Sequence, residues 1–150
     1  MMAQADDDIR ALLDQQAIDM AKGDAQAAIA AYADGPVLYD LPPPLQVTAD
    51  AGGLQEWIDG WDKPPTITYR DLEVSVAGDL AVAWGFVHTA VRRDGEDGGF
   101  WSRNTWAFRR GADGWKITHN HNSVPFYMDD SQRAALDLEP GTGAAEIKGS

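Results

Sequence analysis

The pattern of apolar and polar positions changes from a helical period to a strand period near residue 66. Over residues 6–22 apolar side chains recur at three- and four-residue spacing, which predicts an amphipathic helix. Asp24 suits the N-cap of a second, alanine-rich helix that extends to about Tyr32. A short strand over residues 37–41 and a third helix, opened by Asp50 or Gly52, complete the first half of the chain.

The second half alternates with a period of two, which predicts long strands over residues 66–77, 80–92 and 100–110. A last strand begins at Gly114 and ends before Pro125, and a polar hairpin loop occupies residues 93–99. Because the connections are short, these strands are expected to pair antiparallel. Helices followed by a meander of strands predict an α+β fold, with a curved, mostly antiparallel sheet packed against three N-terminal helices in a cone.

Composition limits the function more than it identifies one. The 150 residues, with 44% hydrophobic content, are sufficient for a single folded domain over residues 1–128. Residues 129–150 are acidic, then small and polar, and are expected to form a partly disordered tail, part of which docks. The net charge of −12 argues against nucleic acid and anionic membranes. Without cysteine, signal peptide or membrane span, a cytoplasmic protein is expected.

Side-chain parity predicts which residues face the interior. Apolar and aromatic residues of like parity indicate an inner face that carries a few polar members. His88 and Asn104 are such members on two strands, and His119 and His121 share one face of the last strand. The aromatic residues predicted on the inner face of these strands are Trp84, Phe86, Phe100, Trp106 and Phe108.

These inward polar residues predict a cavity, because a buried polar group without a partner costs about 1–3 kcal/mol. Gln16 is the polar member of the first helix's apolar face, and Asp40 follows Tyr39 where the short strand meets a proline run. Trp57 and Trp61 lie four residues apart, so their rings cover one face of the third helix. Apolar walls with a few convergent polar groups are typical of small-molecule sites.

The histidine pair allows three interpretations. His119 and His121 could exchange protons, because an unperturbed imidazole titrates near pH ~6.5. They could hold a metal ion if His88 or Asp40 supplied a third ligand, although we predict no metal site. They could also be a structural pair bonded to the backbone or to Asn104.

Several ordered strings resemble the nuclear transport factor 2-like superfamily, and within it the SnoaL-like and ketosteroid-isomerase-like branch. The resemblance covers about residues 6–126. It is carried by Lys-Gly-Asp at 22–24, Tyr-Ala-Asp at 32–34 and Val-Leu-Tyr-Asp at 37–40, then by Asn-Thr-Trp-Ala-Phe-Arg-Arg at 104–110, Asp-Gly-Trp-Lys-Ile at 113–117 and His-Asn-His-Asn-Ser-Val-Pro at 119–125.

The resemblance implies roles for individual residues. In the steroid isomerases a carboxylate at the end of the short strand moves a proton next to a ketone, and Asp40 occupies that place. The oxyanion donors of those enzymes are a tyrosine and a protonated aspartic acid. Gln16 and Asn104 stand at the matching positions, which departs from the family pattern. In the SnoaL-like cyclases an aspartate shares acid–base work with histidines, which His119 and His121 resemble.

The leading hypothesis is therefore a small-molecule-binding protein that transfers protons on a hydrophobic carbonyl compound without a cofactor. Its reaction would be of isomerase, cyclase or dehydratase type, with Asp40, His119, His121 and Asn104 as catalytic residues. The expected substrate-binding residues are Gln16, Tyr39, Trp57, Trp61, Trp84, Phe86, His88 and Trp106. The alternative is a non-catalytic ligand-binding or dimerisation module. A homodimer is expected in either case, because Trp101 has outward parity and an exposed tryptophan favours an interface.

Overall fold

The computed structural model describes residues 2–141, and within this range the chain forms three helices and five strands. Buried Ile9 and Leu13 lie on one face of the first helix, as their spacing predicts. The Asp24 side chain accepts a hydrogen bond from the Ala27 amide and caps the second helix. The helices are α1 (Met2–Ala21), α2 (Ala25–Ile29) and α3 (Ala51–Asp59).

The strands form one sheet in the order β1-β5-β4-β3-β2. The pairs from β2 to β5 are antiparallel, whereas β1 pairs with β5 in parallel. A sheet that is mostly antiparallel with helices on one face is the predicted α+β architecture. The strands are β1 (Tyr32–Tyr39), β2 (Thr66–Ala77), β3 (Leu80–Arg93), β4 (Glu96–Gly111) and β5 (Gly114–Ser123).

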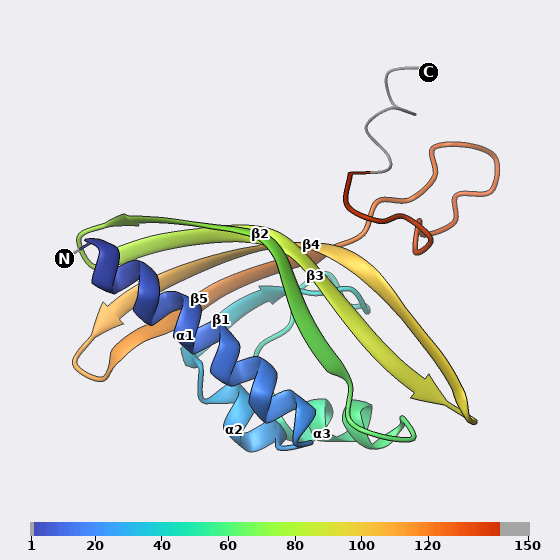
Figure 1. The fold of residues 1–150 in the computed structure, drawn as a ribbon, viewed down its shortest axis with the longest axis horizontal. Coiled ribbons are helices and arrows are strands. Elements are labelled where there is room, and N and C mark those ends of the chain that lie inside the picture. Colours follow the sequence, from blue (N-terminus) through green and yellow to red (C-terminus); the bar gives the residue numbers. More distant parts are fainter. Residues whose placement is uncertain (1, 142–150) are drawn as a thin grey trace.

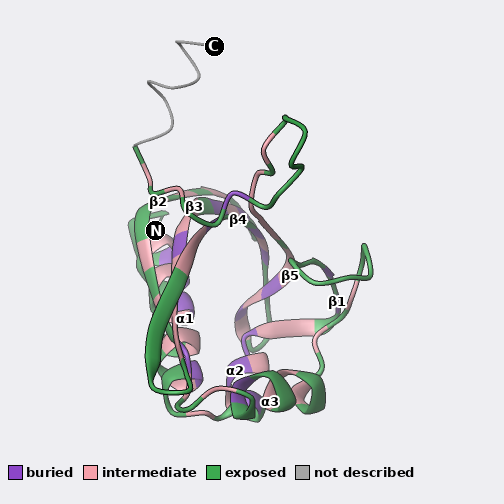
Figure 2. Cartoon of the chain, turned by 90° about the vertical axis from the view of Figure 1, so that its right-hand side faces the viewer, coloured by how far each residue is buried: buried purple, intermediate pink, exposed green. Residues whose placement is uncertain are grey.

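The sheet bends strongly and does not close on itself. Figure 1 shows α1 lying along the sheet with α2 and α3 near one end of it. Figure 2, from the side, shows the sheet as an arch, with α1 along one flank and α2 and α3 across the open end. Buried residues alternate with less buried ones along β3 and β4, so the sheet has an inner and an outer face.

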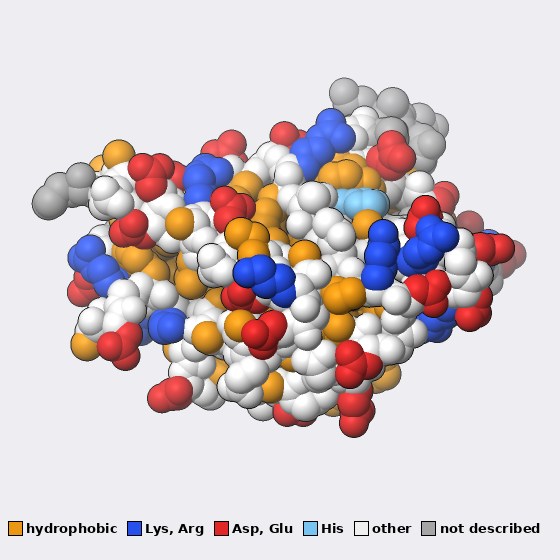
Figure 3. Space-filling view, turned by 60° about the horizontal axis from the view of Figure 1, so that its bottom comes forward, with side chains coloured by type: hydrophobic (Ala, Val, Ile, Leu, Met, Phe, Trp, Pro, Cys, Tyr) orange, Lys and Arg blue, Asp and Glu red, His pale blue; other side chains and the backbone are white. Residues whose placement is uncertain are grey.

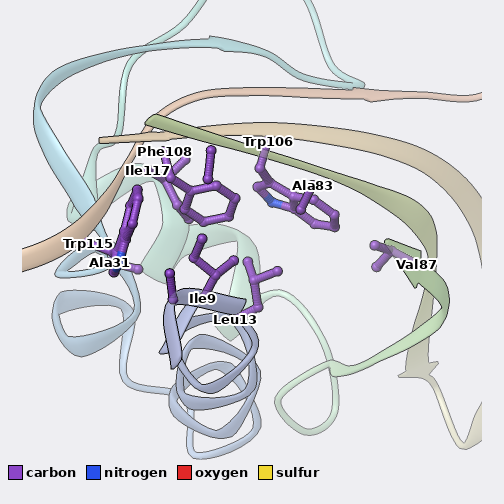
Figure 4. Close-up of a cluster of buried hydrophobic side chains, with 11 residues drawn as sticks. Ile9, Leu13, Ala31, Ala83, Val87, Trp106, Phe108, Trp115 and Ile117 are labelled. Carbon is purple, nitrogen blue, oxygen red and sulfur yellow. The ribbon is translucent and has the colours of Figure 1, made fainter. Parts of the chain in front are cut away.

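The main core fills the space between α1 and the inner face of the sheet. Ile9 and Leu13 point from α1 toward Trp106 and Phe108 of β4 and Ile117 of β5 (Figure 4). All five are at most 3% exposed. A second, smaller cluster joins the helices to one another through Met20, Ala25, Ala28 and Ile58. The core therefore holds α1 against the sheet and leaves the space beside α2 and α3 for a cavity.

Several element boundaries differ from the sequence expectation, most clearly at the end of the second helix and in the hairpin between β3 and β4. The second helix ends at Ile29, and Tyr32 already begins β1, because the β1–β5 pairing extends to Tyr32 opposite Ile117. The expected loop over residues 93–99 is instead mostly paired strand. Its turn is confined to Asp94 and Gly95, both with positive φ, as a tight Asp-Gly hairpin requires.

The chain after β5 folds back on itself within the described residues. Phe126 bridges to Ala134, the Tyr127 amide donates to the Arg133 carbonyl at 2.8 Å, and Ala135 is 3% exposed. Residues 129–141 thus contain a docked part, whereas the division of the chain into a domain and a tail stays a prediction. The last nine residues of the expected tail, 142–150, lie outside the described residues.

The surface reflects the acidic composition. Figure 3 shows aspartate and glutamate side chains scattered over the visible face with basic side chains between them. Ion pairs among the described residues join Arg10 to Asp6, Arg70 to Asp71, Arg92 to Asp97 and Arg110 to Asp79. None of the helices in residues 2–141 combines the length and apolarity that a membrane crossing requires.

Candidate functional site

A cavity of about 1070 Å³ lies between the inner face of the sheet and the helices. All three helices, all five strands and the chain after β5 contribute to its wall. Most of the wall is apolar, with a few polar groups, as in typical small-molecule sites. Its polar and aromatic members are Gln16, Tyr32, Asp40, Thr48, Asp50, Trp57, Trp61, Tyr69, Thr89, Phe100, Asn104, Trp106, Asn120 and Asn122.

Strand β4 presents the residues that parity predicts. Asn104 and Trp106 line the cavity and are 6% and 3% exposed. They alternate with Arg103 and Thr105, which are exposed on the outer face. The inner face of β4 was therefore predicted correctly, because three of its four aromatic residues, Phe100, Trp106 and Phe108, share one parity.

Strand β5 reverses its parity at a β-bulge. Phe108 pairs with Ile117, but the preceding β4 residue, Ala107, pairs with His119, so Thr118 is an extra residue in β5. Before the bulge, Ile117 points inward with Phe108. After it, His119 lies beside Ala107 on the outer face.

Beyond the bulge the asparagines, not the histidines, face the cavity. Asn120 pairs with Trp106 and Asn122 with Asn104, and both asparagines line the cavity. His119 and His121 do not line it. The His119 ring contacts Tyr39 edge-to-face at 4.8 Å, and its Nδ1 is hydrogen-bonded to the Val37 carbonyl. The expected inward placement of His119 and His121 is wrong, because one inserted residue moves every following side chain to the other face.

The inward amides form a directed chain of hydrogen bonds. Asn120 Nδ2 donates to Asn104 Oδ1 at 3.2 Å, and Asn104 Nδ2 donates to Asn122 Oδ1 at 3.0 Å. Asn122 Nδ2 then donates to Asp40 Oδ1 at 3.0 Å. The second N–H of Asn120 is used by the Thr105 carbonyl, and that of Asn104 by Ser102 Oγ. Every amide in the chain therefore has a defined orientation, and the chain ends at a carboxylate.

Asp40 lies at the end of β1, where the parallel pairing with β5 stops. Its Oδ1 accepts from the Leu41 amide at 2.8 Å as well as from Asn122. No partner for Oδ2 occurs within residues 2–141. The carboxyl group lines the cavity while the residue as a whole is solvent-exposed. Asp40 thus has one oxygen held by the protein and one open to a ligand.

Two tyrosines, Tyr32 of β1 and Tyr69 of β2, also line the cavity. Burial raises the pKa of the Tyr32 hydroxyl; a hydrogen bond with Gln16 opposes the rise and the nearby charge of Asp40 adds to it. Burial also raises the pKa of Tyr69, whose hydroxyl donates to the Leu13 carbonyl at 3.0 Å. Gln16 itself donates to the Ala28 carbonyl at 3.2 Å. Both phenols therefore stay protonated and uncharged near neutral pH.

Trp57 and Trp61 line the cavity at the end of α3. Their rings meet edge-to-face at 6.1 Å, and the Arg93 guanidinium lies 4.3 Å from the Trp61 ring centre. The buried Nε1 of Trp61 has no hydrogen-bond partner in the described part of the chain. Trp57 lies on α3 as expected, but Trp61 follows the end of the helix, so the expectation that both rings cover one helix face is wrong although both rings line the cavity.

The inner face of β3 was predicted with the wrong parity. Trp84, Phe86 and His88 point to the outer face, whereas Val87 and Thr89 line the cavity. Large inner residues of β4 leave room only for small partners on β3. Trp106 pairs with Ala83 and Phe108 with Ala81, so the bulky residues of β3 occupy the other side.

The expected site residues therefore divide into two groups. The structure brings one group together around the cavity: Gln16, Asp40, Trp57, Trp61, Asn104 and Trp106. It places the other group outside the cavity: Tyr39, Trp84, Phe86, His88, His119 and His121.

Sequence reasoning missed several residues of the cavity wall. Asn120 and Asn122 were passed over because they alternate with histidines, and nothing in the local sequence marks the bulge. Tyr32 was placed at the end of a helix rather than in a strand. Ala134 and Leu136, in the expected tail, also line the cavity. For Ala134 and Leu136 the sequence offered one signal: Pro125 ends the last strand, so the chain after it could have been expected to turn back.

The described residues contain no group of three or more His, Cys, Asp or Glu side chains arranged to hold a metal ion. The metal interpretation of His119 and His121 required His88 or Asp40 as a third ligand. His88 instead lies against Trp101, with ring centres 4.9 Å apart, and Asp40 is bonded to Asn122. The geometry therefore offers this pair no third ligand among these side chains.

Solved structures share this fold. An NTF2-like protein of unknown function from Pseudomonas putida KT2440 is 28% identical, with a TM-score of 0.80 over 92% of this chain and 98% of that one. An NTF2-like protein with a cystatin-like fold from Novosphingobium aromaticivorans is 21% identical, with a TM-score of 0.70 over 92% of each chain. A protein from Streptomyces avermitilis, named as a candidate dehydratase of the NTF2-like family, is 18% identical, with a TM-score of 0.69 over 82% of this chain and 97% of that one.

The sequence has no match among curated proteins. A family model does match: the SnoaL-like domain matches residues 9–127, which is most of the chain and includes α1 from Ile9 onward, α2, α3 and all five strands. The protein therefore belongs to the SnoaL-like domain family and has the NTF2-like fold.

Proposed function

We propose that the protein binds a hydrophobic carbonyl compound in the cavity and transfers a proton next to the carbonyl, without an organic cofactor. The reaction is of isomerase, cyclase or dehydratase type. The observation that carries the proposal is the Asp40 carboxylate, which lines an otherwise largely apolar cavity. Its Oδ1 is held by Asn122 and by the Leu41 amide, and its Oδ2 is left for the ligand. A carboxylate held in this way is suited to act as a general base.

In the proposed step, Asp40 Oδ2 removes a proton from the carbon next to the carbonyl. The electron pair of that C–H bond forms a carbon–carbon double bond, and the carbonyl π electrons move to oxygen. The resulting enolate needs a hydrogen-bond donor at its oxygen. Asn122 Nδ2 uses one N–H for Asp40, and its other N–H has no partner within residues 2–141. This second N–H is the donor we assign to the oxyanion.

The protonated Asp40 then completes the reaction. Returning the proton to a different carbon isomerises the compound, and giving it to a departing hydroxyl group releases water. Asn104 supports these steps indirectly, since both of its N–H groups are occupied and it orients Asn122. The neutral hydroxyl of Tyr32, bonded to Gln16, provides a second polar contact for the substrate on the α1 side.

The test is exchange of the α-protons of a hydrophobic ketone, such as beta-tetralone, for deuterium in heavy water, followed by NMR. We expect the protein to accelerate exchange and Asp40→Asn to lower the rate by about 10²–10⁴-fold, the usual contribution of a general base. His119→Ala should exchange like the wild type, because its ring lies outside the cavity. Equal rates for Asp40→Asn and the wild type would exclude Asp40 as the base. Mass spectrometry of ligands retained through purification would identify better substrates.

A second role, association of two copies, is favoured by the outer face of the sheet. Trp84 is 45% exposed and Tyr39 is 41% exposed, and both lie on this face with Phe86 and Trp101. Large aromatic side chains gathered on one exposed face are typical of protein–protein interfaces. We propose that the protein is a homodimer that pairs through this face, whether or not the cavity is catalytic.

The mass of the particle in solution, from light scattering, tests the dimer. We expect Trp84→Lys to give a monomer with unchanged circular dichroism, because Trp84 packs outside the core and faces Glu73 on the neighbouring strand. Leu45→Lys is the matched control, since Leu45 is 95% exposed and belongs to no strand of the sheet but to the proline run that follows β1. A monomeric wild type would contradict the proposal.

A further inference from the structure

The charged residues of the cavity wall all have the same sign. Among the described residues, Asp40 and Asp50 are the charged side chains that line it, and no lysine, arginine or histidine does so. The guanidinium of Arg93 packs on Trp61 and donates to the Gly60 carbonyl. It belongs to the wall of a second, smaller hollow near the β3–β4 hairpin. Within residues 2–141, the main cavity therefore has no lysine, arginine or histidine in its wall with which to pair an anionic ligand.

Neither aspartate is neutralised by an ion pair in the part of the chain that the structure describes. Asp40 accepts hydrogen bonds from Asn122 and the Leu41 amide, and Asp50 accepts from the amides of Gly52 and Gly53, at 3.1 Å each. These donors are uncharged, so both negative charges remain. The charge of Asp40 acts on Tyr32, another residue of the wall, where it adds to the rise in pKa that burial causes.

The neutral polar groups of the wall offer an anion two unpaired N–H donors within residues 2–141, the second N–H of Asn122 and Nε1 of Trp61, and neither donor carries a positive charge. The amide hydrogens of Asn104 and Asn120 are already donated within the protein, and Tyr69 donates to the Leu13 carbonyl. An anion that enters would lose its hydration and meet two carboxylates. A cation would instead meet those carboxylates and the aromatic rings of the wall, which attract positive charge.

We infer that the cavity selects ligands by charge: it takes hydrophobic molecules that are uncharged or carry an ammonium group, and it rejects carboxylates, sulfates and phosphates. This inference rests on the proposed function only for the location of the site, and it holds whether or not a reaction occurs there. If the substrate derives from an organic acid, it enters as an ester, an amide or another uncharged form.

Three probes with one naphthalene skeleton and one substituent position test the inference: naphthalenemethanol, naphthylmethylammonium and naphthoate. Isothermal titration calorimetry with the full-length protein should show binding of the alcohol and the ammonium compound. Naphthoate should bind at least about tenfold more weakly than the alcohol, because only it carries the charge that the wall repels.

The double variant Asp40→Asn/Asp50→Asn removes both charges from the wall, and asparagine still caps α3. It should strengthen naphthoate binding by about tenfold and weaken binding of the ammonium compound, with the alcohol unchanged. Asp34→Asn/Asp71→Asn is the matched control, because it changes the net charge equally at two exposed positions outside the cavity. It should leave the order of the probes as in the wild type.

The inference is overturned if naphthoate binds the wild type as tightly as the alcohol does, or if no probe binds. It is also overturned if the control variant Asp34→Asn/Asp71→Asn strengthens naphthoate binding as much as Asp40→Asn/Asp50→Asn does. Failure of the proposed function gives a different result. In that case the ketone exchanges no α-protons above the buffer rate, while the order of the three probes still holds.

Discussion

The inner and outer faces of the sheet use similar residue types for different purposes. On the inner face, Trp106 and Phe108 are buried against α1, and amides line the cavity next to them. On the outer face, tryptophan, tyrosine and all three histidines of the chain lie together without a covering element among the described residues. Residue type alone therefore does not assign a face; the packing partner on the neighbouring strand does.

The strongest way to test the contrast is to remove one large side chain from each face. Phe108 is 1% exposed, and Phe108→Ala should lower the free energy of unfolding by about 3–5 kcal/mol because it leaves a cavity in the core. Trp84→Ala should cost about 1.5 kcal/mol or less, since this ring is 45% exposed. Urea unfolding followed by circular dichroism measures both. A larger loss for Trp84→Ala would show that the outer face is part of the stabilising core.

The second test compares neighbours on β5 that face opposite ways. Asn122→Leu removes the hydrogen bond to Asp40 and the proposed oxyanion donor, and should slow α-proton exchange by about 10–100-fold, the equivalent of one hydrogen bond to a charged group. His121→Leu, one residue away on the outer face, should leave exchange unchanged. The reverse result would mean that the histidine, not the amide, takes part in the reaction.

The third test uses pH, because both tyrosines of the inner wall have raised pKa values. When the pH is below the ordinary tyrosine pKa of about 10, the folded and the unfolded protein both keep the phenol protons, so the free energy of unfolding does not change with the ionisation of these groups. Above it, the unfolded chain loses these protons before the folded protein does, so stability should fall by up to about 1.4 kcal/mol per pH unit for each tyrosine.

Chemical unfolding at about pH 8 and about pH 11 measures this loss. Tyr32→Phe combined with Tyr69→Phe should reduce it. Tyr39→Phe, on the outer face, should retain it, because the two buried tyrosines are still present. An equal loss in the double variant and the wild type would mean that other groups cause the alkaline destabilisation.

The smallest expected effect concerns the chain after β5. Leu136 lines the cavity and is 49% exposed, so Leu136→Ser should weaken binding of naphthalenemethanol by about two- to fivefold, the cost of losing part of an apolar contact. Leu45→Ser, equally conservative but outside the cavity, should bind like the wild type. Calorimetry distinguishes the two. Unchanged binding in Leu136→Ser would show that this segment does not contribute to the wall in solution.

How far the sequence predicted the site depended on the strand. On β4 the parity of Asn104, Trp106 and Phe108 was correct, because the aromatic residues of that parity are the ones that pack in the core. On β5 the same reasoning placed His119 and His121 inside, and one extra residue at Thr118 reversed the result. Parity is reliable only between bulges, and a bulge is a property of two paired strands rather than of one.

The sequence by itself determined the family, the order of helices and strands, and the position of Asp40 at the end of β1, because these follow from local periodicity, turn residues and ordered motifs. Only the tertiary structure decided which side chains meet Asp40. The β5 bulge turns Asn120 and Asn122 toward the cavity, and the size of Trp106 and Phe108 sends the aromatic residues of β3 outward. These choices depend on cross-strand packing between residues far apart in the chain, which no single segment encodes.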